Sequence, residues 1–360
     1  MEKGLCELCN PKQWKTVSTS ELTSTGYPVY GANGVIGYYS NYNHEKETLL
    51  ITCRGATCGT LNICKPFSYI NGNAMALDDL SDEIDIKYLY YFLLSRGLSD
   101  TITGSAQPQI VRQSLKNVRV IYPNLDAQKR IIYVLGKADE LLSIRKQQIA
   151  KLDELVKARF VEMFGESEYP CNSLISLIIE GAGLSYGIVQ PGDDGTGDMG
   201  VLRPVDFVNG KLKTGSIKYI DRSLGNGFKK TELNGNELLI TVRGTTGITA
   251  LTDSRFKGMN VTRGIAVVRY DKKKVDPIYL NEYIKMEKSQ QYIKEHTRGA
   301  TLQQINLSEL RDLEIVIPPL PLQRVFATFV ERVDQQKQTV QQSLEKLELM
   351  KKALMQEYFG

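Results

Sequence analysis

Two segments of the chain repeat apolar positions at alternating spacings of three and four residues. They run from about Asp126 to Met163 and from about Leu322 to Tyr358, and neither contains a proline. A repeat of about 3.5 residues keeps one stripe of a helix against a partner helix, as in a left-handed coiled coil. The pattern predicts two long helices that pack on each other, each about 55 Å long at a rise of about 1.5 Å per residue.

Most positions of this stripe, which we call the seam, are apolar. Four of them are basic: Arg145, Arg159, Lys337 and Lys351. A charged seam residue can fix the register of two helices, or it can extend its charged end to solvent at the edge of the seam, and both alternatives stay open. The apolar residues predicted to hold the helices together are Leu135, Leu142, Ile149, Leu152, Val156, Val330, Val340, Leu344, Leu347 and Leu354.

Short apolar runs separated by turn residues fill the rest of the chain. The runs predict strands at residues 48–53, 74–77, 118–122, 237–242, 265–270 and 313–317. Clusters of Gly and Asn predict turns at 31–34 and 225–227. We expect two shorter helices, one at 86–97 and one at 277–296.

These elements occur twice because the chain contains an internal repeat. Residues 49–60 (LLITCRGATCGT) match residues 238–249 (LLITVRGTTGIT), and residues 104–131 match residues 299–326. The two copies end in similar stretches, KARFVEMFG and KALMQEYFG. A long-range repeat of this kind indicates one structural unit used twice.

The front parts of the two copies barely match. A shared framework with divergent front parts predicts two domains that do the same job on different targets. Paired with the first long helix, the second would run back antiparallel to it, so we expect a rod with one domain near each end and a pseudo-twofold axis across its middle. The expected bounds are 1–124 and 166–320 for the domains and 125–165 and 321–360 for the helices.

Composition excludes several classes of protein. The chain has 42% hydrophobic and 24% charged residues, no apolar run of about 18 residues and no signal-peptide core at its start, so we expect a cytoplasmic globular protein. Phosphate-binding glycine motifs are missing, and two histidines offer few candidates for acid–base catalysis. Cys6 and Cys9 form a lone CxxC without the second pair that a structural zinc needs. The expectation is a binding protein without catalytic residues, metal or cofactor.

Basic residues concentrate in the second copy. Residues 203–274 carry 15 Lys and Arg against 6 Asp and Glu, although the net charge of the whole chain is only +4. Such a cluster attracts phosphates, and the alternative is a solvated basic face. The predicted DNA contacts in this copy are Arg203, Lys229, Lys230, Arg243, Thr245 and Arg263.

The first copy has a segment rich in Tyr and Asn at 27–43 instead of a basic cluster. Asn can bond adenine edges and Tyr can bond phosphates, whereas the alternative is an ordinary hairpin. The predicted DNA contacts in this copy are Tyr30, Asn33, Tyr38 and Arg54.

One Arg-Gly pair follows the LLIT run in each copy, at Arg54-Gly55 and Arg243-Gly244. Such an Arg could contact phosphate or guanine, or it could form a salt bridge that the fold of both copies needs. Glutamines also recur before the last predicted strand of each copy, and we expect them to buttress the start of the long helix. They are Gln107, Gln109, Gln303 and Gln304.

Over its whole length the chain resembles the specificity subunit of type I restriction–modification systems. The resemblance rests on GSAQPQI, on IYPNLDAQKRI with its counterpart IPPLPLQRVF, and on the Gln-Lys and Gln-Arg pairs at the helix starts. The segment GYPVYGANGVIGYY also resembles one subtype of target recognition domain. The resemblance implies an α+β fold, in which two similar α/β target recognition domains are separated by a long antiparallel two-helix coiled coil.

The same resemblance implies a function and partners. The chain would be a non-catalytic subunit whose domains each read one half of a bipartite DNA site, with helices that set the spacer and dock two methyltransferase subunits. Its partners would be double-stranded DNA, those subunits and, where the system cleaves DNA, restriction/translocase subunits. S-adenosylmethionine, Mg and ATP would bind the partner subunits and not this chain. The alternative is a coiled-coil adaptor that binds proteins without binding DNA.

Overall fold

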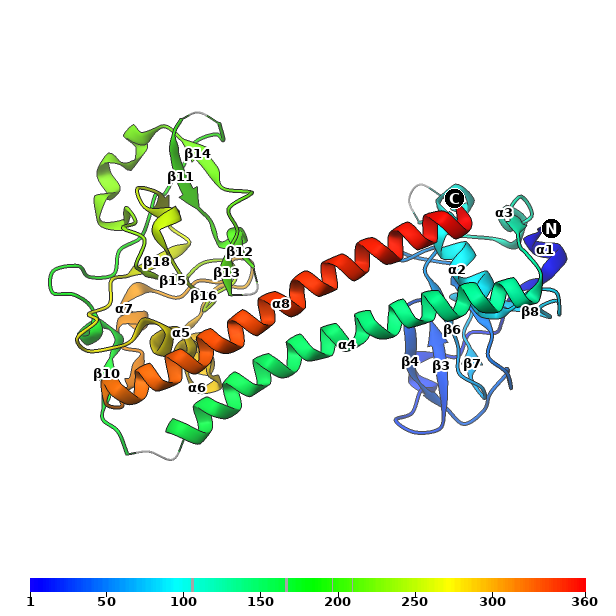
Figure 1. Ribbon diagram of the computed structural model, residues 1–360, viewed down its shortest axis with the longest axis horizontal. Coiled ribbons are helices and arrows are strands. Elements are labelled where there is room, and N and C mark those ends of the chain that lie inside the picture. Colours follow the sequence, from blue (N-terminus) through cyan, green and yellow to red (C-terminus); the bar gives the residue numbers. More distant parts are fainter. Residues whose placement is uncertain (105–106, 166–167, 196, 209) are drawn as a thin grey trace. The chain divides into compact units, whose positions relative to one another are not determined.

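The structure is a computed structural model, and it describes residues 1–104, 107–165, 168–195, 197–208 and 210–360. The chain divides into two compact units: unit 1 is Met1–Gln148 with Val340–Gly360, and unit 2 is Ile149–Thr339. The two long helices, α4 (Leu125–Phe164) and α8 (Leu320–Phe359), each contribute one part to each unit (Figure 1). The predicted domain start at residue 166 lies outside the described residues. Among the described residues, no helix has the length and apolar character needed to cross a membrane.

Each unit contains an antiparallel sheet in which the LLIT strand has a neighbour on both sides. The strand order in unit 1 is β2 (Asn10–Gln13), β8 (Ala74–Asp78), β5 (Leu49–Thr52) and β6 (Leu61–Ile63). In unit 2 it is β16 (Thr249–Leu251), β15 (Leu238–Thr241) and β18 (Ile265–Val268). All four residues of β5 and of β15 are buried, as their unbroken apolar runs predict. The strands predicted at 48–53, 74–77, 237–242 and 265–270 are confirmed.

A second, three-stranded sheet has the same topology in both units, although its sequences do not match. In unit 1, β3 (Tyr27–Gly31) lies between antiparallel β4 (Gly34–Tyr39) and parallel β7 (Tyr69–Ile70). In unit 2, β11 (Met199–Leu202) lies between antiparallel β14 (Lys218–Ile220) and parallel β17 (Asn260–Val261). The two units therefore share the strand pairing of this sheet. The predicted turn at 31–34 joins β3 to β4 and is confirmed.

Unit 2 also contains elements that have no counterpart among the described residues of unit 1. They are the hairpin of β12 (Phe207–Val208) and β13 (Lys211–Leu212), and the 3-10 segment η5 (Arg222–Thr231). The turn predicted at 225–227 is wrong, because these residues lie inside η5. The chain changes direction at Phe228 instead, where the backbone leaves helical geometry.

The first short helix was predicted correctly and the second was not. Helix α2 spans Ile86–Arg96, with Asp85 capping its start and Gly97 following its end at a φ of 72°. The segment predicted as one helix at 277–296 is two helices, α5 (Pro277–Lys285) and α6 (Glu287–His296), separated by Met286 in an extended conformation. The break allows Ile293 of α6 to enter the core, and the Gln290 side chain donates a hydrogen bond to the carbonyl oxygen of Ile284.

A two-stranded antiparallel pair precedes each long helix. These pairs are β1 (Glu2–Gly4) with β9 (Arg119–Ile121), and β10 (Cys171–Ser173) with β19 (Glu314–Val316), which confirms the strands predicted at 118–122 and 313–317. The remaining short elements are α1 (Leu5–Leu8), η1 (Thr19–Glu21), η2 (Ser99–Thr101), α3 (Arg112–Leu115), η3 (Leu174–Leu177), η4 (Pro204–Asp206), η6 (Ser254–Phe256) and α7 (Leu307–Arg311).

One buried glutamine fixes the start of each long helix. The Oε1 of Gln128 accepts a hydrogen bond from the backbone N–H of Asp85 at 2.8 Å, and its Nε2 donates to the carbonyl oxygen of Pro123 at 2.9 Å. Gln323, 195 residues later, makes the equivalent bonds to the backbones of Asp276 and Pro318. Because a buried amide is costly without partners, these bonds define where each helix leaves its domain.

The predicted role of the loop glutamines at this junction is wrong. The backbones of Gln109 and Gln304 pair with the Arg-Gly turns of the two units, and the buried glutamines at the helix starts take the expected role.

The long helices pack antiparallel in each unit. In unit 1, Leu135 near the start of α4 shares a buried cluster with Met355 near the end of α8. In unit 2, Phe160 and Phe164 at the end of α4 contact Phe326 at the start of α8, with ring centroids 5.5 and 5.6 Å apart. The apolar seam residues are all buried or half-buried: Leu135, Leu142, Ile149, Leu152, Val156, Val330, Val340, Leu344, Leu347 and Leu354.

The basic seam residues behave in two ways. Lys351 forms an ion pair with Asp139 of α4 in unit 1, and Lys337 forms one with Asp153 of α4 in unit 2. The two lysines therefore connect the helices, which matches the register alternative. Arg145 and Arg159 bond instead to side chains three residues further along α4, Gln148 and Glu162.

Candidate nucleic-acid interface

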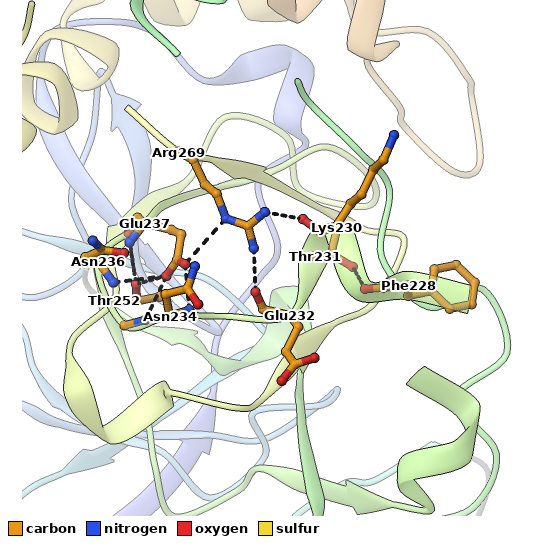
Figure 2. A network of polar contacts seen from close by, with 10 residues as sticks. Phe228, Lys230, Thr231, Glu232, Asn234, Asn236, Glu237, Thr252 and Arg269 are labelled. Carbon is orange, nitrogen blue, oxygen red and sulfur yellow. Dashed lines mark hydrogen bonds and ion pairs between the residues drawn. The ribbon is translucent and has the colours of Figure 1, made fainter. Parts of the chain in front are cut away.

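Lys229 and Lys230 are exposed at the end of η5, and an internal network holds the backbone that carries them. Arg269 of unit 2 donates hydrogen bonds to the carbonyl oxygens of Lys230 and Glu232, at 2.8 and 2.5 Å. Figure 2 shows the Lys230 side chain extending away from this network. The fold thus fixes the backbone of the lysine pair and leaves the ammonium groups free to meet a ligand.

A fully buried carboxylate completes this network. Glu237 accepts hydrogen bonds from the backbone N–H groups of Asn234, Gly235 and Asn236 at 2.6 to 3.0 Å, and from the Thr252 hydroxyl at 2.8 Å. The guanidinium of Arg269 lies 3.7 Å from it. Because the buried charge is both paired and hydrogen-bonded, the loop after the lysine pair is held in one conformation.

Asn260 anchors the same segment from its other side. It is buried, its Oδ1 accepts a hydrogen bond from the Thr231 hydroxyl at 2.7 Å, and its amide donates to the carbonyl oxygen of Phe228 at 3.1 Å. The lysine pair therefore lies between two anchored positions, Phe228 and Thr231.

Arg203, which is predicted as a DNA contact, bonds other residues of unit 2, although 33% of its side chain is exposed. Its guanidinium bonds the buried carboxylate of Asp206 at 3.0 Å and the carbonyl oxygen of Ser216 at 2.6 Å. The hydrogen bond to Asp206 raises the pKa of the Arg203 guanidinium. Removing Arg203 would leave a buried carboxylate without its cation, so Arg203 also stabilises unit 2.

Several other basic residues of the cluster are also paired. Ion pairs join Arg222 to Asp198, Arg255 to Asp253 and Lys211 to Asp334. Among the predicted contacts in unit 2, the side chains of Lys229, Lys230, Arg243, Thr245 and Arg263 have no bonding partner within the described residues. The charge available to a ligand is therefore smaller than the count of basic residues suggests.

The predicted contacts of unit 1 separate into one buried and three exposed residues. Tyr30 is only 7% exposed, packs in a buried cluster with Leu50 and accepts a hydrogen bond from the backbone N–H of Lys65, which leaves little of its surface for a DNA contact. Asn33 is exposed in the β3–β4 turn, where its Oδ1 accepts a bond from the Thr57 hydroxyl at 2.8 Å. Tyr38 and Arg54 are exposed.

One arrangement of backbone recurs in both units. Arg54 forms an antiparallel bridge with Gln109, and Arg243 forms one with Gln304. Residues paired in this way present their side chains on the same face, so each unit places one Arg beside one Gln. Sequence reasoning missed the two glutamines as neighbours of the arginines, although both residue types recur in the two copies.

The described residues offer no group of three or more His, Cys, Asp and Glu side chains that could hold a metal ion. In the CxxC pair, Cys9 is buried, and burial raises the pKa of its thiol to about 12. A thiol held protonated is a poor metal ligand and a poor nucleophile.

Comparisons with known proteins agree on one family. A family model described as type I restriction modification DNA specificity domain matches residues 1–154 and 195–349. The putative MjaX specificity subunit of Methanocaldococcus jannaschii, a type I restriction enzyme subunit, is 25% identical over 309 residues, which cover 81% of this chain and 71% of that protein. The EcoprrI specificity subunit of Escherichia coli is 30% identical over 115 residues, which cover 32% of this chain and 28% of that protein.

A solved structure agrees in fold. The S subunit of a type I restriction–modification system from M. genitalium superposes with a TM-score of 0.64 at 16% identity, covering 100% of this chain and 96% of that one. The matching family is a DNA specificity domain and not an enzyme. Because its model covers most of the sequence, the chain belongs to the type I restriction–modification DNA specificity family.

Proposed function

We propose that each domain of this chain reads one half of a bipartite DNA site and that α4 and α8 set the spacing between the halves. The observation that carries the proposal is the repeated unit. Both copies pair the LLIT strand on both sides, share the strand order of the second, three-stranded sheet and have the same helix start, while the sequences of their front parts differ. Two domains with a shared framework can be placed on DNA in the same way, and their different front parts can then contact different base sequences.

The exposed lysine pair supplies sequence-independent attraction in this proposal. Lys229 and Lys230 would neutralise phosphates and fix the position of unit 2 on the duplex. Exposed polar side chains of the front parts, such as Asn33 and Tyr38, would contribute to base contacts in the groove.

The outer faces of the long helices support docking of methyltransferase subunits. In unit 1 these faces expose Tyr133 at 68% and Leu349 at 69%, and in unit 2 they expose Val161 at 60%. A hollow of about 390 Å³ in unit 1 lies beside Tyr133 and Gly136. Tyr is among the residue types enriched at the energetically dominant positions of protein interfaces. S-adenosylmethionine, Mg and ATP would then bind the partner subunits of the complex.

Replacing the lysine pair is expected to weaken DNA binding equally for all sequences. In the double variant Lys229→Ala/Lys230→Ala, two phosphate contacts are lost, so the slope of log K against log salt should become less steep by about 2. Binding of the chain to a duplex at four or more salt concentrations measures this slope.

The matched control is Lys288→Ala/Lys294→Ala, which removes two exposed lysines of unit 2 outside the basic cluster. We expect this control to keep the slope of the unaltered chain. An unaltered slope in the Lys229/Lys230 variant would show that these two lysines do not contact phosphates. A complete lack of salt-sensitive duplex binding by the unaltered chain would favour a protein adaptor instead.

A further inference from the structure

The two Arg–Gln pairs, Arg54 with Gln109 and Arg243 with Gln304, have the same surroundings in both units. In unit 1, the backbone N–H of Gly55 donates to the carbonyl oxygen of Pro108 at 3.1 Å. In unit 2, the N–H of Gly244 donates to the carbonyl oxygen of Gln303 at 2.8 Å. Each glutamine thus lies directly across from the arginine that ends the LLIT region.

A second set of bonds closes the loop that carries each glutamine. Gln109 exchanges two backbone hydrogen bonds of 2.8 Å with Thr103, and Gln304 exchanges two of 2.8 Å with Arg298. The turn beyond each arginine contains a glycine with positive φ, 92° at Gly55 and 83° at Gly244. The position of each pair is therefore set by main-chain bonds and by glycine conformation.

The side chains of the four residues do not help to hold the pairs in position. Arg54 and Gln109 are exposed, and Arg243 and Gln304 are half-exposed. Within the described part of the chain, none of the four side chains forms a hydrogen bond or ion pair. Since the fold uses only their backbones, the presence of Arg and Gln side chains in both units calls for a ligand outside the chain.

The duplication restricts what that ligand can be. The proposed half-sites differ in sequence, so a residue pair that is the same in both domains cannot discriminate between them. The feature that two DNA half-sites share is the sugar–phosphate backbone, which Arg and Gln side chains bond without reading sequence. We propose that the Arg54–Gln109 and Arg243–Gln304 pairs are equivalent clamps on DNA phosphates, one in each half-site.

This inference rests on the proposed function, and it assigns unit 1 a phosphate contact despite its lack of a basic cluster. The experiment uses the chain in complex with methyltransferase subunits. It employs two duplexes, one with the bipartite site mapped by adenine methylation and one with both half-sites scrambled. Affinities for both are measured over a range of salt concentrations for Arg54→Ala, Arg243→Ala and the double variant.

Each single variant should lose about tenfold in affinity for both duplexes, because one hydrogen-bonded charged contact is removed. The salt slope should fall by about 1 in each single variant and by about 2 in the double variant. Gln109→Ala and Gln304→Ala should weaken binding to both duplexes. They should not change the salt slope, since an amide neutralises no phosphate charge. Lys116→Ala and Lys288→Ala, which remove one exposed lysine from each unit outside the long helices and outside the Arg–Gln pairs, are the matched controls and should change neither quantity.

Three results would overturn the inference. A loss of affinity confined to the duplex with the bipartite site would show that the pairs contact bases. Unchanged affinity and slope would show that the pairs do not contact DNA, and loss of methyltransferase co-purification without loss of DNA binding would show a protein contact. If the unaltered complex fails to bind either duplex, the proposed function itself fails, which is a separate outcome.

Discussion

Removing one heptad from each long helix is expected to abolish recognition of the original DNA site. The variant lacks Leu142–Gln148 of α4 and Gln342–Glu348 of α8. Asp139 pairs with Lys351 and Asp153 with Lys337, so these two heptads lie opposite each other in the register that the ion pairs define. Their joint removal keeps the alternation of three and four residues along both seams.

The expected consequence follows from the rise of a helix. Seven residues shorten each helix by about 10 Å, the length of about three base pairs. Sequencing of methylated adenines in cells that carry the variant should show the same two half-sites with a shorter spacer, or no methylation. A control variant in which the two heptads are replaced by two other heptads of the same seam pattern should keep the original spacer. Methylation of the unaltered site by the deletion variant would show that the helices do not set the distance.

Replacing Phe326 with Ala is expected to destabilise the chain by about 3–5 kcal/mol. Phe326 is fully buried at the start of α8, where its ring meets Phe160, Phe164 and Tyr279 at centroid distances of 5.5, 5.6 and 6.4 Å. Removing the ring leaves a cavity that the three neighbouring aromatic rings cannot fill, and it also removes the edge-on aromatic contacts.

Urea unfolding followed by far-ultraviolet circular dichroism measures this effect as a shift of the unfolding midpoint. Val325→Ala is the matched control, because Val325 is adjacent on the same helix and 54% exposed, and its loss should cost no more than about 0.5 kcal/mol. If the two variants unfold at the same urea concentration, the aromatic cluster does not stabilise the pairing of α4 and α8 in unit 2.

The parts of the fold that the sequence predicted are those with strong local signals. The heptad positions run from Leu135 to Met163 and from Val330 to Tyr358, and the LLIT strands are unbroken apolar runs, so periodicity alone identified them. The second sheet was missed because its strands are short and pair across large sequence distances, as β3 does with β7. Nothing local marks the break at Met286, which precedes a helix whose Ile293 packs in the core.

The sequence predicted which segments carry the candidate DNA contacts, but it did not predict how individual side chains are bonded or buried. The basic cluster was identified, but the sequence does not show that Arg203 forms an ion pair with Asp206. The sequence likewise does not show which tyrosines of the β3–β4 hairpin are buried. A shift in pairing register between Val29 and Tyr30 interrupts the alternation of faces along β3, so spacing alone could not tell that Tyr30 points into the core.

Sequencing of methylated adenines in cells that contain this chain and its methyltransferase subunits tests the central claim most directly. If each domain reads one half of a split site, the methylated positions share two short defined sequences separated by a fixed number of unspecified base pairs. Exchanging the front part of one copy, residues 1–48 or 166–237, should then change one half of that motif and leave the other half intact. A contiguous motif, or a motif altered in both halves by a single exchange, would contradict the account.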